Sequence, residues 1–136
     1  MNAQNIEQKL LNGPYHQWLG LKVAQAGEGE ITLILPFREE FVVNPAGGYI
    51  HGGILATLID LAADWALVAW TSKGVPTLNL HVDYHRPARG ELTVKAKVIK
   101  HGKLASSAEA WVYDAEGRLV ASGRGLYATP AQQGAA

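Results

Sequence analysis

The stretch GILATLIDLAADWALVAW, which runs from Gly53 to Trp70, is the longest apolar run in the chain and decides its fold class. At about 1.5 Å per residue it forms a helix about 27 Å long, close to the thickness of a bilayer core. Asp60 and Asp64 argue against a membrane span, because charged groups are costly there. On a helix these acids share a narrow stripe with Thr57, and apolar side chains cover nearly all the rest. We therefore expect a helix enclosed by protein.

The sequence on either side of this helix alternates between apolar and polar residues, which predicts strands. Two strands form a hairpin before the helix, and four follow it as an antiparallel meander joined by tight turns. Such a sheet has one face to cover, and the helix is the only long apolar element available. The predicted fold is α+β, an antiparallel sheet wrapped around one long central helix. The predicted strands are 21–26, 30–37, 76–86, 91–100, 104–113 and 118–128, with a loop at 41–50.

The length of 136 residues predicts a single domain, 1–136, large enough to bury a hydrophobic core. Its composition, 48% hydrophobic and 18% charged, is typical of a soluble globular protein. We expect residues 1–18 to be an N-terminal helical segment and residues 129–136 to be a loose tail.

Net charge and cysteine content exclude several classes of function. Twelve Lys and Arg balance twelve Asp and Glu, so the chain lacks the positive charge that attracts nucleic acid or an anionic membrane. We expect neither as a partner. The chain has no cysteine, which excludes disulfides, thiolate nucleophiles and cysteine-ligated metal centres. The polar N-terminal segment does not read as a signal peptide, and we expect a cytoplasmic location.

The two carboxylates of the central helix are the first candidates for chemistry, because a buried charge is costly unless it is paired or faces a cavity. Asp60 and Asp64 could instead face solvent or a subunit interface and be salt-bridged there, an alternative that applies more to Asp64 than to Asp60. The sequence His51-Gly52-Gly53 marks the predicted start of the helix. Free backbone N–H groups and the positive end of the helix dipole meet at such a start and can hold an oxyanion. An ordinary flexible helix entry would have the same sequence.

The spacing of these residues resembles that of the hotdog-fold acyl-CoA thioesterases, in the branch that includes the phenylacetate-pathway enzyme. Asp60 follows His51 by nine positions at the start of a wholly apolar helix, and this is the most specific part of the pattern. The resemblance covers residues 19–128. Its other matching residues are Asn44, Thr77, Tyr84-His85-Arg86-Pro87, Gly102-Lys103, Gly117 and Gly123 to Tyr127.

The resemblance implies hydrolysis of acyl-CoA thioesters, with aryl or medium- to long-chain acyl groups, to the free acid and CoA. In that family the backbone N–H at the position of Gly52 binds the thioester carbonyl oxygen. Asp60, from the opposite subunit, is implied to act as nucleophile or as general base for water. Asn44 is implied to orient the water or the thioester, Thr77 to assist Asp60, and His51 to order the loop.

The resemblance also implies a homodimer whose sheets join edge to edge, with two active sites at the subunit interface, and which can pair further into a homotetramer. No metal and no redox cofactor are expected. A neutral protein must supply local cations for the phosphates of coenzyme A. The candidates for binding coenzyme A are Arg86, Arg89, Lys100 and Lys103, which could equally be solvated surface charges, together with Gly53 at the helix start.

His81, Asp83 and His85 alternate along a predicted strand, so their side chains share one face of it. Ligands about 6.6 Å apart along a strand seldom converge on one ion, and we expect a polar sheet face or a subunit contact there.

Two alternatives to hydrolysis stay open. One is a hydratase or dehydratase of acyl thioesters in which His51 shuttles protons, and the other is a module that binds acyl-CoA without turnover.

Overall fold

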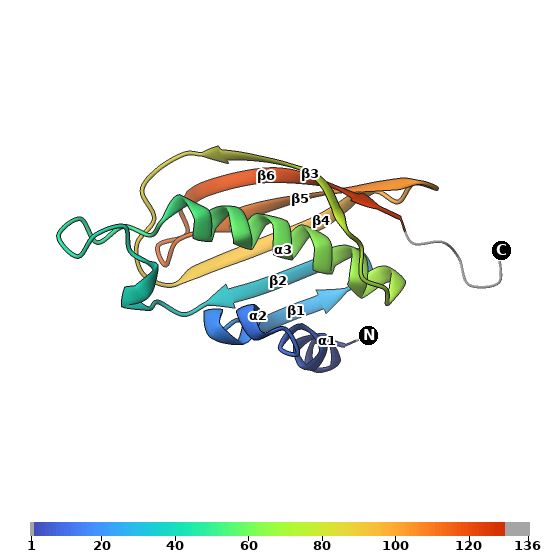
Figure 1. Cartoon of the computed structure of the whole chain (residues 1–136), viewed down its shortest axis with the longest axis horizontal. Helices are drawn as coiled ribbons and strands as arrows, with labels where there is room; N and C mark the ends of the chain where they lie inside the picture. Colours follow the sequence, from blue (N-terminus) through green and yellow to red (C-terminus); the bar gives the residue numbers. More distant parts are fainter. Residues whose placement is uncertain (1, 130–136) are drawn as a thin grey trace.

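The computed structural model describes residues 2–129 and contains a six-stranded antiparallel sheet that curves around one long helix, α3 (Gly52–Thr71) (Figure 1). This confirms the prediction of a sheet wrapped around a central helix. Two short helices, α1 (Ala3–Leu10) and α2 (Pro14–Leu19), precede the sheet, and a 3-10 turn, η1 (Glu39–Phe41), precedes α3. The strands are β1 (Lys22–Gly27), β2 (Glu30–Leu35), β3 (Thr77–Tyr84), β4 (Leu92–Lys100), β5 (Ala105–Tyr113) and β6 (Leu119–Ala128).

The strand order is β1-β2-β4-β5-β6-β3, which corrects one part of the prediction. Only β4, β5 and β6 form the expected meander, and β3 is not a neighbour of β4. Instead, β2 pairs with β4 and takes that position, so β3 lies at the sheet edge and pairs with β6. The segment 85–91 is therefore a crossover from the edge to the middle of the sheet, and not a hairpin turn. One long side of β3 has no strand partner within residues 2–129.

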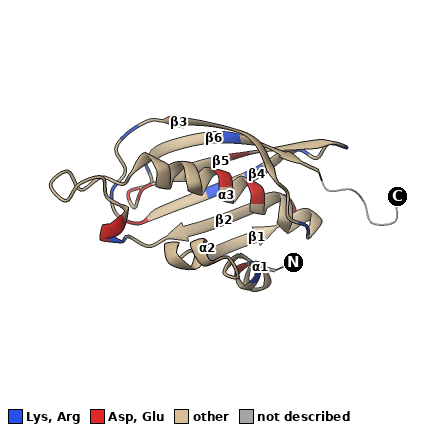
Figure 2. Ribbon diagram, viewed as in Figure 1, with Lys and Arg blue, Asp and Glu red and all other residues tan. Residues whose placement is uncertain are grey.

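The helix α3 forms the centre of the hydrophobic core. Apolar side chains from nearly all around it are buried, including Leu58, Ile59 and Leu67 with no exposed surface. Burial of each such side chain contributes about 1.5–3 kcal/mol. By length and composition α3 could cross a membrane, but 56% of its most apolar window is buried inside the protein, as in the core helix of a globular domain. Its two acidic residues, red in Figure 2, interrupt the apolar surface near its middle.

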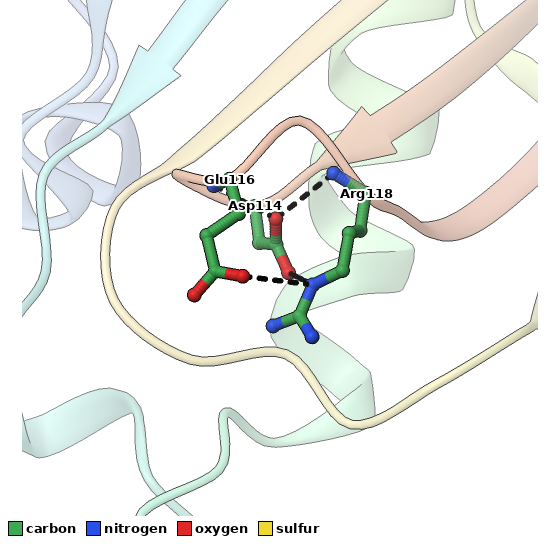
Figure 3. Close-up of polar contacts among 3 residues, drawn as sticks. All are labelled: Asp114, Glu116 and Arg118. Atoms are coloured by element: carbon green, nitrogen blue, oxygen red, sulfur yellow. Dashed lines mark hydrogen bonds and ion pairs between the residues drawn. The ribbon is translucent and has the colours of Figure 1, made fainter.

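The turn between β5 and β6 is held by the side chain of Asp114, which is only 6% exposed (Figure 3). Asp114 accepts hydrogen bonds from the backbone amides of Glu116 and Arg118 and from Nε of Arg118, at 2.8–3.0 Å. The Arg118 amide is the main cause that holds the pKa of Asp114 below its ordinary value. Gly117 completes the turn at φ +79°, a conformation that residues with a side chain rarely adopt.

Thr129, at the start of the predicted tail, is tied to the end of the sheet. Its backbone N–H donates to the carbonyl of Leu104 at 2.9 Å, and its hydroxyl donates to the carbonyl of Gly102 at 2.8 Å. Ser106 shares a further hydrogen bond with that hydroxyl. The rest of the predicted tail, residues 130–136, lies outside the described residues.

Candidate active site

Asp60 lies on the face of α3 that meets the start of β3 and the end of β6. The Thr77 hydroxyl donates a hydrogen bond to Oδ1 of Asp60 at 2.9 Å. The Tyr127 hydroxyl is 3.0 Å from the same Oδ1 and 3.0 Å from the Asp60 main-chain oxygen. Within residues 2–129, no group donates to the other carboxylate oxygen, Oδ2. The structure thus brings Thr77 to Asp60, and leaves one oxygen of Asp60 available to a ligand.

Tyr127 contacts Asp60, although the sequence analysis assigns it no role beyond its place at the end of a matching strand segment. Its side chain is fully buried. Burial, followed by the negative charge of Asp60, raises the pKa of Tyr127 above its ordinary value, so the phenol stays protonated and donates. In the sequence, an aromatic residue near the end of a strand reads as ordinary core. The signal that could have found it is Gly125, two residues earlier on the same strand face.

Asp64 lies one helical turn beyond Asp60 and is half-buried. Burial is the main cause that raises its pKa to about 7, and the nearby charge of Asp60 raises it further. A hydrogen bond from the Val75 backbone amide opposes this shift. Asp64 has no salt bridge among the described residues of this chain, and an ion pair at a subunit interface stays a prediction.

We expect Asp64→Asn to stabilise the protein above neutral pH. The folded wild type keeps the Asp64 proton up to a pKa of about 7, whereas the unfolded chain loses it near 3.8. Stability of the wild type therefore falls as pH rises through this window. Allowing for the partial exposure of Asp64, the free energy of unfolding of Asp64→Asn should exceed that of the wild type by about 1–3 kcal/mol at pH 8. Near pH 4 the two should be equal. Urea unfolding at several pH values measures this difference, and a pH-independent gap would contradict it.

The start of α3 leaves one backbone amide free. His51 is the N-cap, and its Nδ1 accepts a hydrogen bond from the Gly53 amide at 2.8 Å. The Gly53 amide is therefore occupied. The Gly52 amide has no acceptor within the described residues, whereas the Gly52 carbonyl accepts a hydrogen bond from the Tyr84 hydroxyl at 2.9 Å. This free N–H at the positive end of a 20-residue helix is suited to binding an oxyanion.

Gly52 and Asp60 of one chain lie far apart along α3. Eight residues of helix separate them by about 12 Å along the axis at about 1.5 Å per residue. A carbonyl oxygen bound by the Gly52 amide and a carbon attacked from Asp60 each require contact at about 3 Å. At this separation, Asp60 of the same chain is beyond the reach of direct attack on a carbonyl group bound by the Gly52 amide.

Asn44 lies on the exposed loop before α3. Its side-chain Oδ1 accepts a hydrogen bond from the Gly47 amide at 2.6 Å and so closes a turn. In the described part of the chain Asn44 makes no hydrogen bond to Asp60 or Gly52. Within a single chain the structure does not bring Asn44 to the two reactive groups.

The four candidate cations fall into two groups. Arg86 and Arg89 lie in the crossover 85–91, near the start of α3, and Arg89 donates to the carbonyl of Gly47 at 3.3 Å. Lys100 ends β4, and Lys103 follows it in the next turn. Eight residues of strand at about 3.3 Å each place this end about 26 Å from the arginine end. One chain therefore presents two separate pairs of cations.

His81 and Asp83 of β3, and His85 directly after it, are exposed. His81 Nε2 lies 3.1 Å from Asp83 Oδ2, and His85 Nε2 lies 2.8 Å from the hydroxyl of Ser122. The described residues contain no group of three potential ligands placed to hold a metal ion. His81 and Asp83 thus bond to each other, whereas His85 bonds to Ser122, so the three alternating residues do not form one ligand set.

Comparison with known proteins identifies the family. The family model described as thioesterase superfamily matches residues 47–121, more than half of the chain. The chain belongs to the thioesterase superfamily. A putative esterase of Halobacterium salinarum is 40% identical over 121 residues, which are 81% of this chain and 80% of the relative. Human acyl-coenzyme A thioesterase 13 is 33% identical over 109 residues, which are 76% of each chain.

Solved structures of the thioesterase superfamily share this architecture. One of them is 43% identical in sequence, covers 94% of this chain and 98% of its own length, and superposes with a TM-score of 0.90. The hotdog fold expected from the sequence is therefore confirmed. The segment 47–121 matched by the superfamily includes Gly52, Asp60 and Thr77, whereas Asn44 and Tyr127 lie outside it.

Proposed function

We propose that this member of the thioesterase superfamily hydrolyses acyl-CoA thioesters with aryl or medium- to long-chain acyl groups. The observation that carries the proposal is the carboxylate of Asp60, held by two hydroxyls through one oxygen and free at the other. The similarity to the human relative, an acyl-CoA thioesterase, supports the substrate class.

Asp60 supplies the reacting carboxylate through Oδ2. As a general base it takes a proton from water while the water oxygen attacks the thioester carbonyl carbon. As a nucleophile it forms an anhydride with the acyl group, which water then hydrolyses. In either route the C–S bond breaks, CoA leaves as its thiol after taking up a proton, and the acyl group leaves as the free acid.

Gly52 stabilises the negative charge that develops on the thioester oxygen. Its amide has no acceptor within residues 2–129, and it lies at the first turn of α3 where the helix dipole favours an anion. A preorganised donor of this kind typically accelerates acyl transfer by about 10²–10³-fold. The carbonyl oxygen of the substrate then accepts a hydrogen bond from the Gly52 N–H.

The proposed active enzyme is a homodimer that joins two sheets along β3. This strand has an open edge, and its Leu78 and Tyr84 side chains are 58% and 56% exposed. A long, exposed apolar edge strand is a surface that normally pairs with another strand. Pairing of two copies is also the arrangement that allows Gly52 and Asp60, about 12 Å apart in one chain, to meet across the interface.

Arg86 and Arg89 are the proposed ligands for the phosphates of coenzyme A. Both are exposed, and they lie beside the start of α3, where the thioester oxygen would bind. Their guanidinium groups suit bidentate binding of phosphate. Lys100 and Lys103, at the far end of β4, are the second proposed pair.

The test is release of free thiol from phenylacetyl-, hydroxybenzoyl-, butyryl-, hexanoyl- and palmitoyl-CoA, followed with a thiol reagent. We expect turnover of at least one aryl, medium-chain or long-chain substrate. Crotonyl-CoA, followed by loss of its enoyl absorbance, tests the hydratase alternative in the same experiment. Loss of enoyl absorbance without thiol release would replace hydrolysis by hydration, and tight binding without any turnover would replace it by a binding function.

A further inference from the structure

Two hydroxyl groups on adjacent strands bind the same oxygen of Asp60. Thr77 on β3 and Tyr127 on β6 are direct partners in the strand register, so their side chains lie on the same face of the sheet. Their hydroxyls lie 2.9 and 3.0 Å from Oδ1. The Tyr127 hydroxyl also reaches the Asp60 main-chain oxygen at 3.0 Å, so it contacts both the backbone and the side chain of this one residue.

Gly125 provides the space that the Tyr127 ring occupies. A Cβ atom at position 125 would lie 2.1 Å from the Tyr127 hydroxyl and 2.3 Å from two carbons of its ring. The ring therefore folds back along its own strand, over the glycine, and this directs the hydroxyl to α3. Any side chain at position 125 would displace it, so the strand contains a glycine where this contact requires one.

From this geometry we infer that Tyr127 is a positioning residue for the reaction of Asp60, and that Oδ2 is the oxygen that reacts. With two donors on Oδ1, rotation of the carboxylate would break both hydrogen bonds, so the group has one preferred orientation. The lone pairs of Oδ2 are the ones left for water or for the acyl carbon. The expected effect of Tyr127 on kcat rests on the proposed function, whereas the orientation of the Asp60 carboxylate rests on the hydrogen bonds described above.

Tyr127→Phe removes one oxygen atom and keeps the buried ring. We expect kcat to fall about 10- to 100-fold with KM nearly unchanged, the loss that corresponds to one hydrogen bond to a charged group. Tyr113→Phe is the matched control, because Tyr113 is a half-buried strand tyrosine of β5 whose ring lies under the Lys95 ammonium group, 5.7 Å from its centroid, and not beside Asp60. It should retain wild-type kcat.

A double-mutant cycle separates positioning from a general structural role. In the Asp60→Asn background, Tyr127→Phe should lower the residual rate much less than it lowers the wild-type rate, because it acts through the carboxylate. An equal factor in both backgrounds, or wild-type kcat for Tyr127→Phe, would overturn the inference. Either of these outcomes would contradict the role of Tyr127 and leave the proposed thioesterase function unchanged. A wild type that is inactive on every thioester would contradict the proposed function and not the contact between Tyr127 and Asp60.

An NMR measurement without substrate tests the inference whether or not the protein hydrolyses a thioester. The side-chain carboxyl carbon of Asp60 can be observed by NMR in protein labelled with ¹³C-aspartate and identified by its loss in Asp60→Asn. We expect Tyr127→Phe to shift this signal and Tyr113→Phe to leave it in place. An unmoved signal in folded Tyr127→Phe would show that the tyrosine does not hold the carboxylate.

Discussion

Replacement of Asp60 by asparagine is expected to lower kcat by about 10²–10⁴-fold, the range for loss of a general base. The substitution keeps the size of the side chain, and the amide oxygen can still accept from Thr77 and Tyr127 at the position of Oδ1. The amide nitrogen then stands at the position of Oδ2. Because this NH₂ group has no lone pair to accept a proton or attack a carbon, the reaction slows while the fold is retained.

The matched control for Asp60→Asn is Glu28→Gln, which also removes one carboxylate charge. Glu28 is exposed in the turn between β1 and β2, on the far edge of the sheet from β3. Thiol release from the best acyl-CoA substrate should be unchanged in Glu28→Gln. Circular dichroism and size-exclusion chromatography establish that Asp60→Asn is folded and assembled. Full activity in a folded Asp60→Asn variant would exclude the Asp60 carboxylate as general base or nucleophile.

The central helix is the part of the fold that was most fully predictable. The apolar run predicted a helix over 53–70, and α3 covers Gly52–Thr71. Periodicity reports which faces of a segment are buried, and a helix that is apolar nearly all round has to be surrounded. The prediction of a sheet around the helix followed from the need to cover these apolar faces.

The position of β3 could not be predicted in the same way. Both β2 and β3 follow an alternating pattern, and either could have paired with β4 on that evidence. Pairing depends on contacts between residues far apart in sequence, and the alternation of apolar and polar residues does not specify them. The strand order matters for function, because it leaves the edge of β3 open beside Asp60.

The proposed reactive residues could be predicted from the sequence more fully than the residues that hold them in place. The spacing of His51, Gly52 and Asp60 on one helix is local, so the sequence displays it directly. Tyr127 lies 67 residues from Asp60 and reaches it only through the fold. The raised pKa of Asp64 likewise depends on its burial in the folded protein, which the helix sequence alone does not show.

Removal of the Gly52 amide hydrogen by Gly52→Pro is expected to lower kcat by about 10²–10³-fold, the cost of one oxyanion-hole donor. Proline is favoured at the first residue of a helix, and His51, at φ −56° and ψ 134°, already has the extended conformation that precedes proline. The control is Gly52→Ala, which keeps the N–H. Its Cβ would lie 3.3 Å from the exposed Tyr84 ring, which can move, so Gly52→Ala should stay within a few-fold of the wild type.

A mixture of Gly52→Pro with Asp60→Asn tests whether two chains share each site. In a mixed dimer, the free amide of the Asp60→Asn chain meets the intact Asp60 of the Gly52→Pro chain, and the second site has neither group. Random exchange of subunits makes about half of the dimers mixed, each with one intact site of two, so about a quarter of wild-type activity should return. Recovery needs groups from both chains on one carbonyl, as the separation of about 12 Å along α3 requires. If the mixture stays as inactive as its parents after exchange is demonstrated, Gly52 and Asp60 do not form a site across subunits.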